Sequence, residues 1–347
     1  MRAVRYARYG EPPVLVDVPV PACPEGGILV DVRAVGVCRS DWHAWQGHDP
    51  VPLPMIGGHE FAGVVRESRV RRCRPGDRVT VPFAIGCGLA TCAQCAEGDP
   101  HVCPDQHQPG FTYDGAFAEV VAVPAADTNV VALPESLGFV AAAALGCRFA
   151  TAYRAVKHQG RLTAGERVVV LGAGGVGLSA VRIAVALGAH VVCVDTSAAA
   201  LAMATASGAV AAIQMDAQRS AGDLASVLLD TTDGGAHLSI DAVGSPALLE
   251  AGLLALRPRG RHVQVGLLLG PAADPPVPMA RIIARELQVL GSHGMPVRDY
   301  AEMLDFVVAI DLSGLVGEVI DLESAPSALI RLGEGSQPAG MTVIELS

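Results

Sequence analysis

The chain has 347 residues, a formal net charge of −10 at pH 7, 51% hydrophobic residues and 17% charged residues. This length predicts two domains that each bury a core, and the acidic charge argues against nucleic acid or an anionic membrane as a partner. The first ten residues mix charged and apolar side chains and no apolar run reaches about 18 residues, so we expect a cytoplasmic protein without a signal peptide or transmembrane helix.

The first part of the chain is rich in proline, glycine and short β-branched runs. Such runs, bounded by turn residues, predict short strands. The clearest lie at residues 28–32, 63–65 and 77–81, and another is expected within the first ten residues. We therefore predict a mostly β domain over residues 1–148.

Three motifs of this domain contain side chains that bind metals: Cys38-Arg39-Ser40-Asp41, Gly58-His59-Glu60 and Leu145-Gly146-Cys147-Arg148. Two thiolates and an imidazole can hold a zinc ion with one coordination position left open, as catalytic zinc sites do. A single cysteine such as Cys147 is more often an ordinary buried residue. Its place shortly before a nucleotide-binding segment favours the ligand assignment.

A second group of cysteines lies in one segment: Cys87, Cys92, Cys95 and Cys103. Four thiolates form closed zinc sites that contribute folding energy and take no part in catalysis. The four-residue spacer after Cys87 is within the range of zinc ligands, and His101 is the alternative ligand if Cys87 points away. The remaining cysteines are interpreted as small buried residues, and their odd number argues against disulfides: Cys23, Cys73 and Cys193.

From residue 149 to 291 the pattern changes to strands that alternate with helices rich in alanine and leucine. This alternation predicts a parallel, doubly wound sheet. The expected strands lie at 168–171, 191–194, 239–242 and 262–266, and a helix at 176–187 ends at Gly188.

A dinucleotide fingerprint connects the first of these strands to that helix: Gly172-Ala173-Gly174-Gly175-Val176-Gly177. Gly172 permits the tight turn, Gly174 lets the backbone approach a pyrophosphate, and Gly177 allows close helix–strand packing. The start of the helix offers free N–H groups and a positive dipole to phosphates. A glycine-rich turn without a cofactor is the alternative, and the strand and helix on either side argue against it.

Asp195 closes the next strand, eighteen residues after Gly177. A carboxylate at this place accepts hydrogen bonds from the adenosine ribose. Residues 196–198 contain no arginine or lysine to receive a 2′-phosphate, which favours NAD over NADP. Three further residues complete the expected cofactor site: Val176, Val243 and Val265.

These motifs resemble, nearly end to end, the zinc-dependent alcohol dehydrogenases of the medium-chain dehydrogenase/reductase superfamily. The resemblance implies a GroES-like catalytic domain over 1–148, a Rossmann domain over 149–291, and a segment 292–347 that returns to the catalytic domain. It also implies two zinc ions per chain, NAD, and a homodimer or homotetramer built through the sheet edge at 287–291.

The same resemblance implies roles for residues around the catalytic zinc. Ser40 would bind the substrate oxygen and take its proton, and His43 would relay that proton to solvent. Asp41 would fix the tautomer of His59. Two further assignments complete the set: Glu60 behind the metal and Arg39 at the cofactor pyrophosphate.

The expected reaction is reversible oxidation of a primary or secondary alcohol to an aldehyde or ketone with NAD, with zinc acting as a Lewis acid. Within the superfamily, a polyol or other specialised-alcohol dehydrogenase is the first alternative. A zinc-free quinone or enoyl reductase would lack the cysteine motifs. A non-enzymatic zinc-binding module would have no use for the glycine fingerprint, and the acidic charge opposes a nucleic-acid partner for it.

Overall fold

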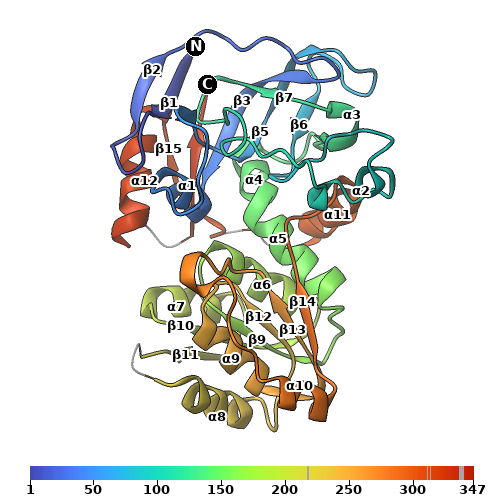
Figure 1. Cartoon of the computed structure of the whole chain (residues 1–347), viewed down its shortest axis with the longest axis vertical. Coiled ribbons are helices and arrows are strands. Elements are labelled where there is room, and N and C mark those ends of the chain that lie inside the picture. Colours follow the sequence, from blue (N-terminus) through green and yellow to red (C-terminus); the bar gives the residue numbers. More distant parts are fainter. Residues whose placement is uncertain (217–218, 311, 313, 336–339) are drawn as a thin grey trace. The chain divides into compact units, whose positions relative to one another are not determined.

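The computed structural model describes residues 1–216, 219–310, 312, 314–335 and 340–347. The chain divides into two compact units, one formed by Met1–Ala150 with Gly294–Ser347 and the other by Thr151–His293. Figure 1 shows strands in both units and more helix in the second. None of the described helices has the length and apolar character needed to cross a membrane.

The first unit is built on a seven-stranded sheet in the order β15-β16-β3-β5-β6-β8, with β7 paired to β3. A smaller sheet has the order β2-β1-β4. The strands are β1 (Arg2–Tyr6), β2 (Val14–Asp17), β3 (Ile28–Val37), β4 (Met55–Ile56), β5 (Glu60–Ser68), β6 (Arg78–Thr80), β7 (Val120–Val123), β8 (Val131–Ala132), β15 (Val316–Ile320) and β16 (Met341–Glu345). This confirms the mostly β character expected of this part of the chain.

The described helical segments of the first unit are short, with at most ten residues each. They are α1 (Arg39–Trp45), α2 (Ala93–Ala96), η1 (Pro100–Val102), α3 (Ala126–Asn129), α4 (Phe139–Ala144), η2 (Leu145–Phe149), η5 (Val297–Asp299), α11 (Tyr300–Ala309), η6 (Leu322–Ser324) and α12 (Ala325–Glu334). The short helix α5 (Ala150–Tyr153) crosses into the second unit, where η3 (Arg154–Gln159) follows it.

The second unit contains a six-stranded sheet in the order β11-β10-β9-β12-β13-β14, and every pair in it is parallel. Its strands are β9 (Arg167–Leu171), β10 (His190–Asp195), β11 (Ala211–Gln214), β12 (Ala236–Asp241), β13 (Leu256–Gln264) and β14 (Gln288–Gly291). Its helices are α6 (Gly175–Ala186), α7 (Ala198–Ala206), α8 (Ala221–Thr231), α9 (Pro246–Leu254), η4 (Gly270–Ala272) and α10 (Met279–Arg285). The predicted parallel sheet is confirmed.

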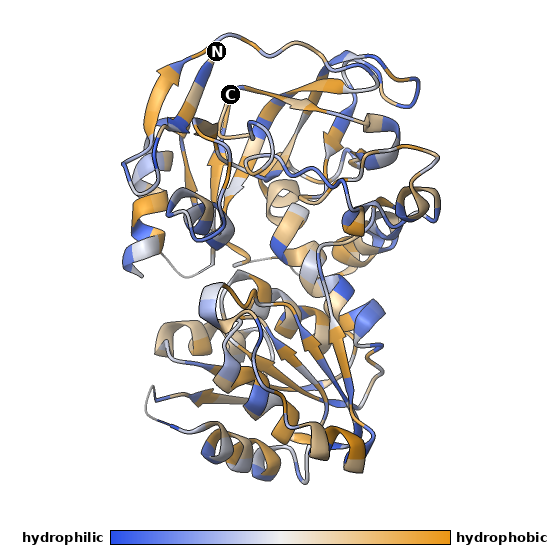
Figure 2. Cartoon of the chain, in the orientation of Figure 1, coloured by the Kyte–Doolittle hydropathy of each residue, from blue (hydrophilic) through white to orange (hydrophobic). Residues whose placement is uncertain are grey.

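The central strands of this sheet consist mainly of hydrophobic residues, as the hydropathy colours of Figure 2 show. Val169, Leu171, Val192 and Val194 are all fully or almost fully buried in one core cluster. A sheet covered by helices on both faces buries both sides of its strands, so near-continuous β-branched runs are expected there.

The strand expected at residues 262–266 is the clearest error in the sequence-based assignment. β13 begins six residues earlier, at Leu256, and ends at Gln264. The run 257–261 hid its beginning, because it contains three arginines, a proline and a glycine; in the structure the register with β12 is interrupted between Leu256 and Arg261. Its end comes early because the N–H groups of Val265 and Gly266 both donate to the Asp241 carbonyl oxygen, at 3.0 and 2.8 Å, which turns the chain away.

Candidate active site and metal centres

Cys38, His59 and Cys147 come together inside the first unit. Their ligand atoms all lie within 4.8 Å of one another, and the three residues are 5%, 1% and 7% exposed. Two of them meet because β3 and β5 are antiparallel with Gly36 opposite Glu60, which places Cys38 and His59 at the same end of the pair. The twenty residues between them form the excursion through α1 and β4.

Cys147 reaches the cluster from a different segment. It lies in η2, a π-helical turn directly after α4. Such turns widen the helix locally and are frequent at functional sites. The hydroxyl of Tyr300, at the start of α11, donates to the Gly146 carbonyl oxygen at 3.0 Å and holds this turn.

The imidazole of His59 is oriented for metal binding. Its Nδ1 lies 2.8 Å from Asp41 Oδ1, so the carboxylate accepts the Nδ1 proton and leaves a lone pair on Nε2. That Nε2 atom is buried and has no hydrogen-bond partner. Asp41 is fixed in turn by the backbone N–H groups of Cys38, at 2.9 Å, and Gly58, at 3.1 Å. A buried lone pair beside two thiols fits a zinc ion, because an unsatisfied polar atom is otherwise costly.

The two buried thiols also fit a metal. Hydrogen bonding to Cys147 lowers the pKa of Cys38 well below its usual value, and the same contact raises that of Cys147. Thiols bind zinc as thiolates, and the lowered pKa of Cys38 suits that kind of binding.

Glu60 lies beside the cluster and is held by Arg148. Its Oε1 accepts the N–H groups of Cys147 and Arg148 at 3.1 and 3.0 Å, and its Oε2 lies 2.7 Å from an Arg148 guanidinium nitrogen. Both side chains are buried, and burial raises the pKa of Glu60 against the opposing charge of Arg148. Glu60 thus positions the turn that carries Cys147 and is not one of the three clustered ligands.

The residues expected to move a proton lie on α1 and the loop after it. The Ser40 hydroxyl is 3.9 Å from the Cys38 sulfur. His43 is half-buried, and its Nδ1 lies 3.1 Å from Nδ1 of His48. Both imidazoles contact the Trp42 ring edge-on, at centroid distances of 4.9 and 5.1 Å. Arg39 is exposed, with its guanidinium carbon 5.4 Å from the same ring.

The four cysteines of the second group also converge. Cys87 lies 3.8 Å from Cys95 and Cys92 lies 3.7 Å from Cys103, sulfur to sulfur, and all four sulfurs are within 4.8 Å of one another. Cys87 therefore reaches the group despite its longer spacer. A Cβ on Gly86 would lie 2.6 Å from the Cys95 sulfur, so the approach to this group requires glycine.

The glycine fingerprint lies in the second unit, between β9 and α6. Gly172 has φ +97°, and a Cβ on Gly177 would lie 1.8 Å from the Gly172 carbonyl oxygen. A Cβ on Gly174 would meet nothing within 4 Å. The loop thus leaves open space next to Gly174, at the N-terminus of α6, where a pyrophosphate fits. Gly175 and Val176 form the first turn of α6.

Asp195 and the two later valines lie at the carboxyl ends of neighbouring strands. Asp195 accepts the N–H of Ala173 at 2.6 Å and that of Ser197 at 2.8 Å, so its carboxylate borders the glycine loop. Val243 is half exposed, and a Cβ on Gly172 would lie 2.5 Å from its Cγ2 atom. Val265 follows β13 in the adjacent turn. Ligands of parallel sheets bind at this edge.

Two residues of this arrangement were missed in the sequence. Arg148 directly follows Cys147 in the sequence. Its position next to an expected metal ligand was the signal that could have pointed to its ion pair with Glu60. His48 lies five residues beyond His43, and no local pattern in the sequence predicts that the two imidazoles are in contact.

Two parts of the chain match known protein families. Residues 24–135 match the family profile described as alcohol dehydrogenase GroES-like domain, and residues 175–309 match the one described as zinc-binding dehydrogenase. The chain is 32% identical to an alcohol dehydrogenase of Geobacillus stearothermophilus over 100% of both chains. It is 33% identical to an NAD-dependent alcohol dehydrogenase of Sulfurisphaera tokodaii over 99% of both. The solved structure of an alcohol dehydrogenase from Thermus sp. ATN1 has a TM-score of 0.89 at 29% identity, covering 100% of each chain.

Proposed function

This chain belongs to the zinc-dependent alcohol dehydrogenases of the medium-chain dehydrogenase/reductase superfamily, and from that we propose that it reversibly oxidises a primary or secondary alcohol with NAD. One observation carries the proposal: the buried Nε2 lone pair of His59, without a partner, beside the thiols of Cys38 and Cys147. This donor set is that of an open, catalytic zinc site.

The proton path follows from the residues around this cluster. Zinc held by Cys38, His59 and Cys147 would act as a Lewis acid that lowers the pKa of an alcohol hydroxyl. The Ser40 hydroxyl would accept the substrate proton while it releases its own, and His43 would carry that released proton towards solvent. Asp41 keeps the Nδ1 proton on His59 and so keeps Nε2 available as a ligand. NAD, held by the glycine loop and Asp195, would supply the nicotinamide that accepts the hydride from the substrate carbon.

We also propose a second zinc ion, held by Cys87, Cys92, Cys95 and Cys103. The convergence of four sulfurs in one loop supports it. A site closed by four thiolates has no position for substrate and stabilises the fold of the loop. The chain would then hold two zinc ions with separate tasks.

A homodimer or homotetramer assembled through β14 is part of this proposal. β14 is an edge strand of its sheet, and Val289 within it is 45% exposed. An exposed edge strand offers unpaired backbone groups to a second copy of the chain. Light scattering that gives the mass of a single chain would contradict this assembly.

The direct test is NADH formation at 340 nm with primary, secondary, benzylic and polyol alcohols, and NADP run in parallel. We expect turnover within one alcohol class and faster turnover with NAD. Protein that contains two zinc ions per chain and yet binds NADH without oxidising any alcohol would contradict the proposal.

Replacing Asp195 with alanine tests the cofactor assignment. We expect KM for NAD to rise about tenfold or more, because hydrogen bonds to a charged carboxylate contribute about 1.5–3 kcal/mol. KM for NADP should change less, so the preference of the enzyme for NAD over NADP should become smaller. Asp195→Asn is the matched control, since its amide oxygen can still accept the Ala173 N–H. If the ratio of KM for NAD to KM for NADP is unchanged in Asp195→Ala, Asp195 does not bind the cofactor ribose.

Replacing His48 with glutamine tests the relay. Burial lowers the pKa of His43, and the neighbouring His48 lowers it further. Neutral His43 accepts the proton, so alcohol oxidation is lost as pH falls through the pKa of His43. Without His48 this pKa rises, and the acidic limb of the kcat profile should move to higher pH. The control His107→Gln, in the same unit, should leave the pH profile of kcat unchanged. If the acidic limb of that profile does not move in His48→Gln either, the two imidazoles are not coupled.

A further inference from the structure

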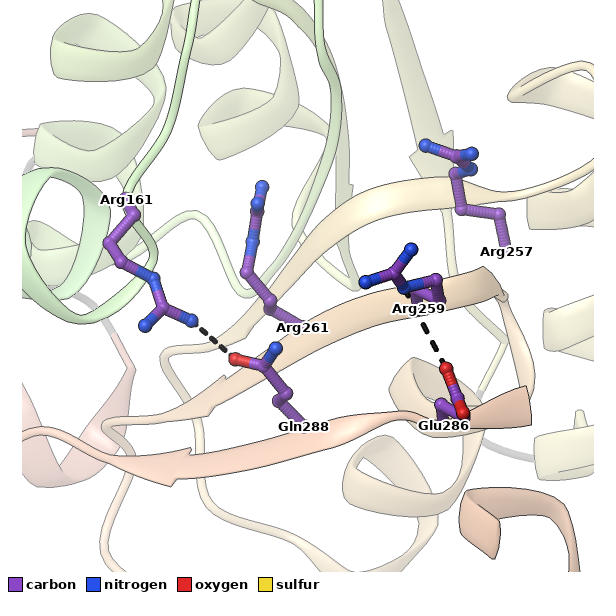
Figure 3. A pocket seen from close by; sticks show the side chains of 6 residues that line it. All are labelled: Arg161, Arg257, Arg259, Arg261, Glu286 and Gln288. Carbon is purple, nitrogen blue, oxygen red and sulfur yellow. Dashed lines mark hydrogen bonds and ion pairs between the residues drawn. The ribbon is translucent and has the colours of Figure 1, made fainter. Parts of the chain in front are cut away.

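A pocket with four arginines among its six lining residues lies in the second unit, and no step of the proposed reaction uses it. Its volume is about 460 Å³, and Figure 3 shows the lining side chains: Arg161, Arg257, Arg259, Arg261, Glu286 and Gln288. Arg261 and Gln288 are opposite each other in the β13–β14 register. Arg161 lies two residues after η3, and Glu286 directly follows α10.

The lining is strongly positive although the chain as a whole is acidic. The lining residues carry four guanidinium groups and one carboxylate, which gives them a net charge of +3. Arg161 donates to the uncharged amide oxygen of Gln288, and Arg257 forms no ion pair among the described residues. Arg259 and Glu286 are 3.7 Å apart with both side chains about 80% exposed, so water screens this pair.

Only one of the four arginines is firmly neutralised. Arg261 contacts both carboxylate oxygens of Glu166, at 2.7 and 2.8 Å. The positive field extends to His237, whose pKa is lowered by burial and then by Arg257. Like charges concentrated at one place repel each other, and an anion in the pocket relieves that repulsion.

Part of the backbone around the pocket lies in the left-handed region. Three lining residues have positive φ angles: Arg161 at 47°, Arg259 at 61° and Glu286 at 48°. They make up most of the non-glycine residues with positive φ in the described chain; the others are Ala125 and Asp233. Left-handed backbone favours glycine, and strain of this kind is found where a ligand is held.

The pocket is separate from the proposed cofactor site. It lies where β13 and β14 begin their pairing, at Arg261 and Gln288. The glycine fingerprint follows β9, at the opposite, carboxyl edge of the same parallel sheet. Strands of this length span roughly 13 Å from one edge to the other.

We propose that this arginine pocket binds a phosphate-bearing anion, either free or as part of a nucleotide. Guanidinium groups present paired N–H donors that match the oxygens of a phosphate. Arg257, which has no ion pair among the described residues, and Arg161, which is hydrogen-bonded only to the uncharged Gln288 amide, can each pair with one phosphate group. The proposal does not depend on the oxidation of alcohols.

Calorimetric titration of the zinc-loaded protein tests it, with saturating NAD so that the dinucleotide site is filled. The probes are inorganic phosphate, pyrophosphate and ADP. We expect pyrophosphate to bind more tightly than phosphate and the affinity to fall as salt is added. If ADP binds more tightly than pyrophosphate, the pocket is assigned to nucleotides. If ADP and pyrophosphate bind with equal affinity, the pocket is assigned to free phosphates.

The variant Arg161→Gly/Arg257→Gln should weaken pyrophosphate binding at least tenfold. Glycine suits the positive φ of Arg161, so the thermal midpoint without anion should not fall. Pyrophosphate should raise that midpoint for the unsubstituted protein and not for the variant. The matched control is Arg8→Gln/Arg69→Gln, which removes the same charge from exposed arginines of the other unit.

Two results would overturn the proposal. One is equal weakening in the pocket variant and in the control, which would reduce the effect to net charge. The other is that the unsubstituted protein does not bind pyrophosphate. If, in that case, the pocket variant also has a different mass by light scattering, these arginines form a contact between copies of the chain.

Discussion

The Cys147→Ala variant should lose at least about 10³-fold in kcat/KM for alcohol oxidation and should contain one zinc ion fewer per chain. A factor of this size is about 4 kcal/mol, within the several kcal/mol that a Lewis-acid metal contributes. Alanine leaves only Cys38 and His59 as ligands, which is too few for a stable zinc site. Elemental analysis and steady-state kinetics measure the two effects separately.

Cys73→Ala is the control for this variant. Cys73 is also a buried cysteine of the first unit, 5% exposed, and belongs to neither cysteine cluster. It should retain the zinc content and the activity. NADH binding, followed by fluorescence, should be retained in both variants because the glycine loop is untouched. Full zinc content in Cys147→Ala would exclude Cys147 as a ligand.

The Arg148→Met variant should lower the free energy of unfolding by about 3–5 kcal/mol, which is the typical cost of leaving one partner of a buried ion pair uncompensated. Glu60 is 0% exposed and loses the guanidinium partner that it has among the described residues. Chemical denaturation measures the loss. It should be smaller at low pH, because Glu60, whose pKa burial already raises, then takes up a proton and becomes neutral.

Two further variants test that reasoning. In Glu60→Gln/Arg148→Met the buried charge is absent, and the amide oxygen can still accept the two backbone N–H groups, so stability should be partly regained. Arg66→Met removes an exposed pair with Asp31 and should cost less than about 1 kcal/mol. A loss in Arg148→Met no larger than in Arg66→Met would show that the buried pair does not stabilise the fold.

The fold was predictable where one segment carries its own signal. Val168–Leu171 reads as a buried strand because its β-branched run is continuous, and the glycines that follow it permit only a tight turn into a helix. The predicted α6 differs from the observed helix by one residue at each end. β13 was misjudged because its beginning contains Arg257, Pro258 and Arg259: two charges and a proline without an N–H conceal a strand that is held by its neighbours.

The candidate site was predictable only in part. The motif context pointed to Cys38, His59 and Cys147, and the structure brings these residues together, while their metal-binding role stays a prediction. The Glu60–Arg148 pair was not foreseen, since it joins residues 88 positions apart in the sequence. The contact between His43 and His48 depends on the loop after α1, whose course no periodic pattern specifies.

The sequence by itself determined the family, the two kinds of architecture and the chemistry of the ligand set. Residue types and short spacings are enough for these, because thiols, imidazoles and glycine turns act through local geometry. Tertiary structure alone decided that His59 Nε2 is buried without a partner, that Arg148 neutralises Glu60, and which arginines share a pocket. Burial and long-range charge depend on which strands are neighbours, and neighbours are set only when the whole sheet has formed.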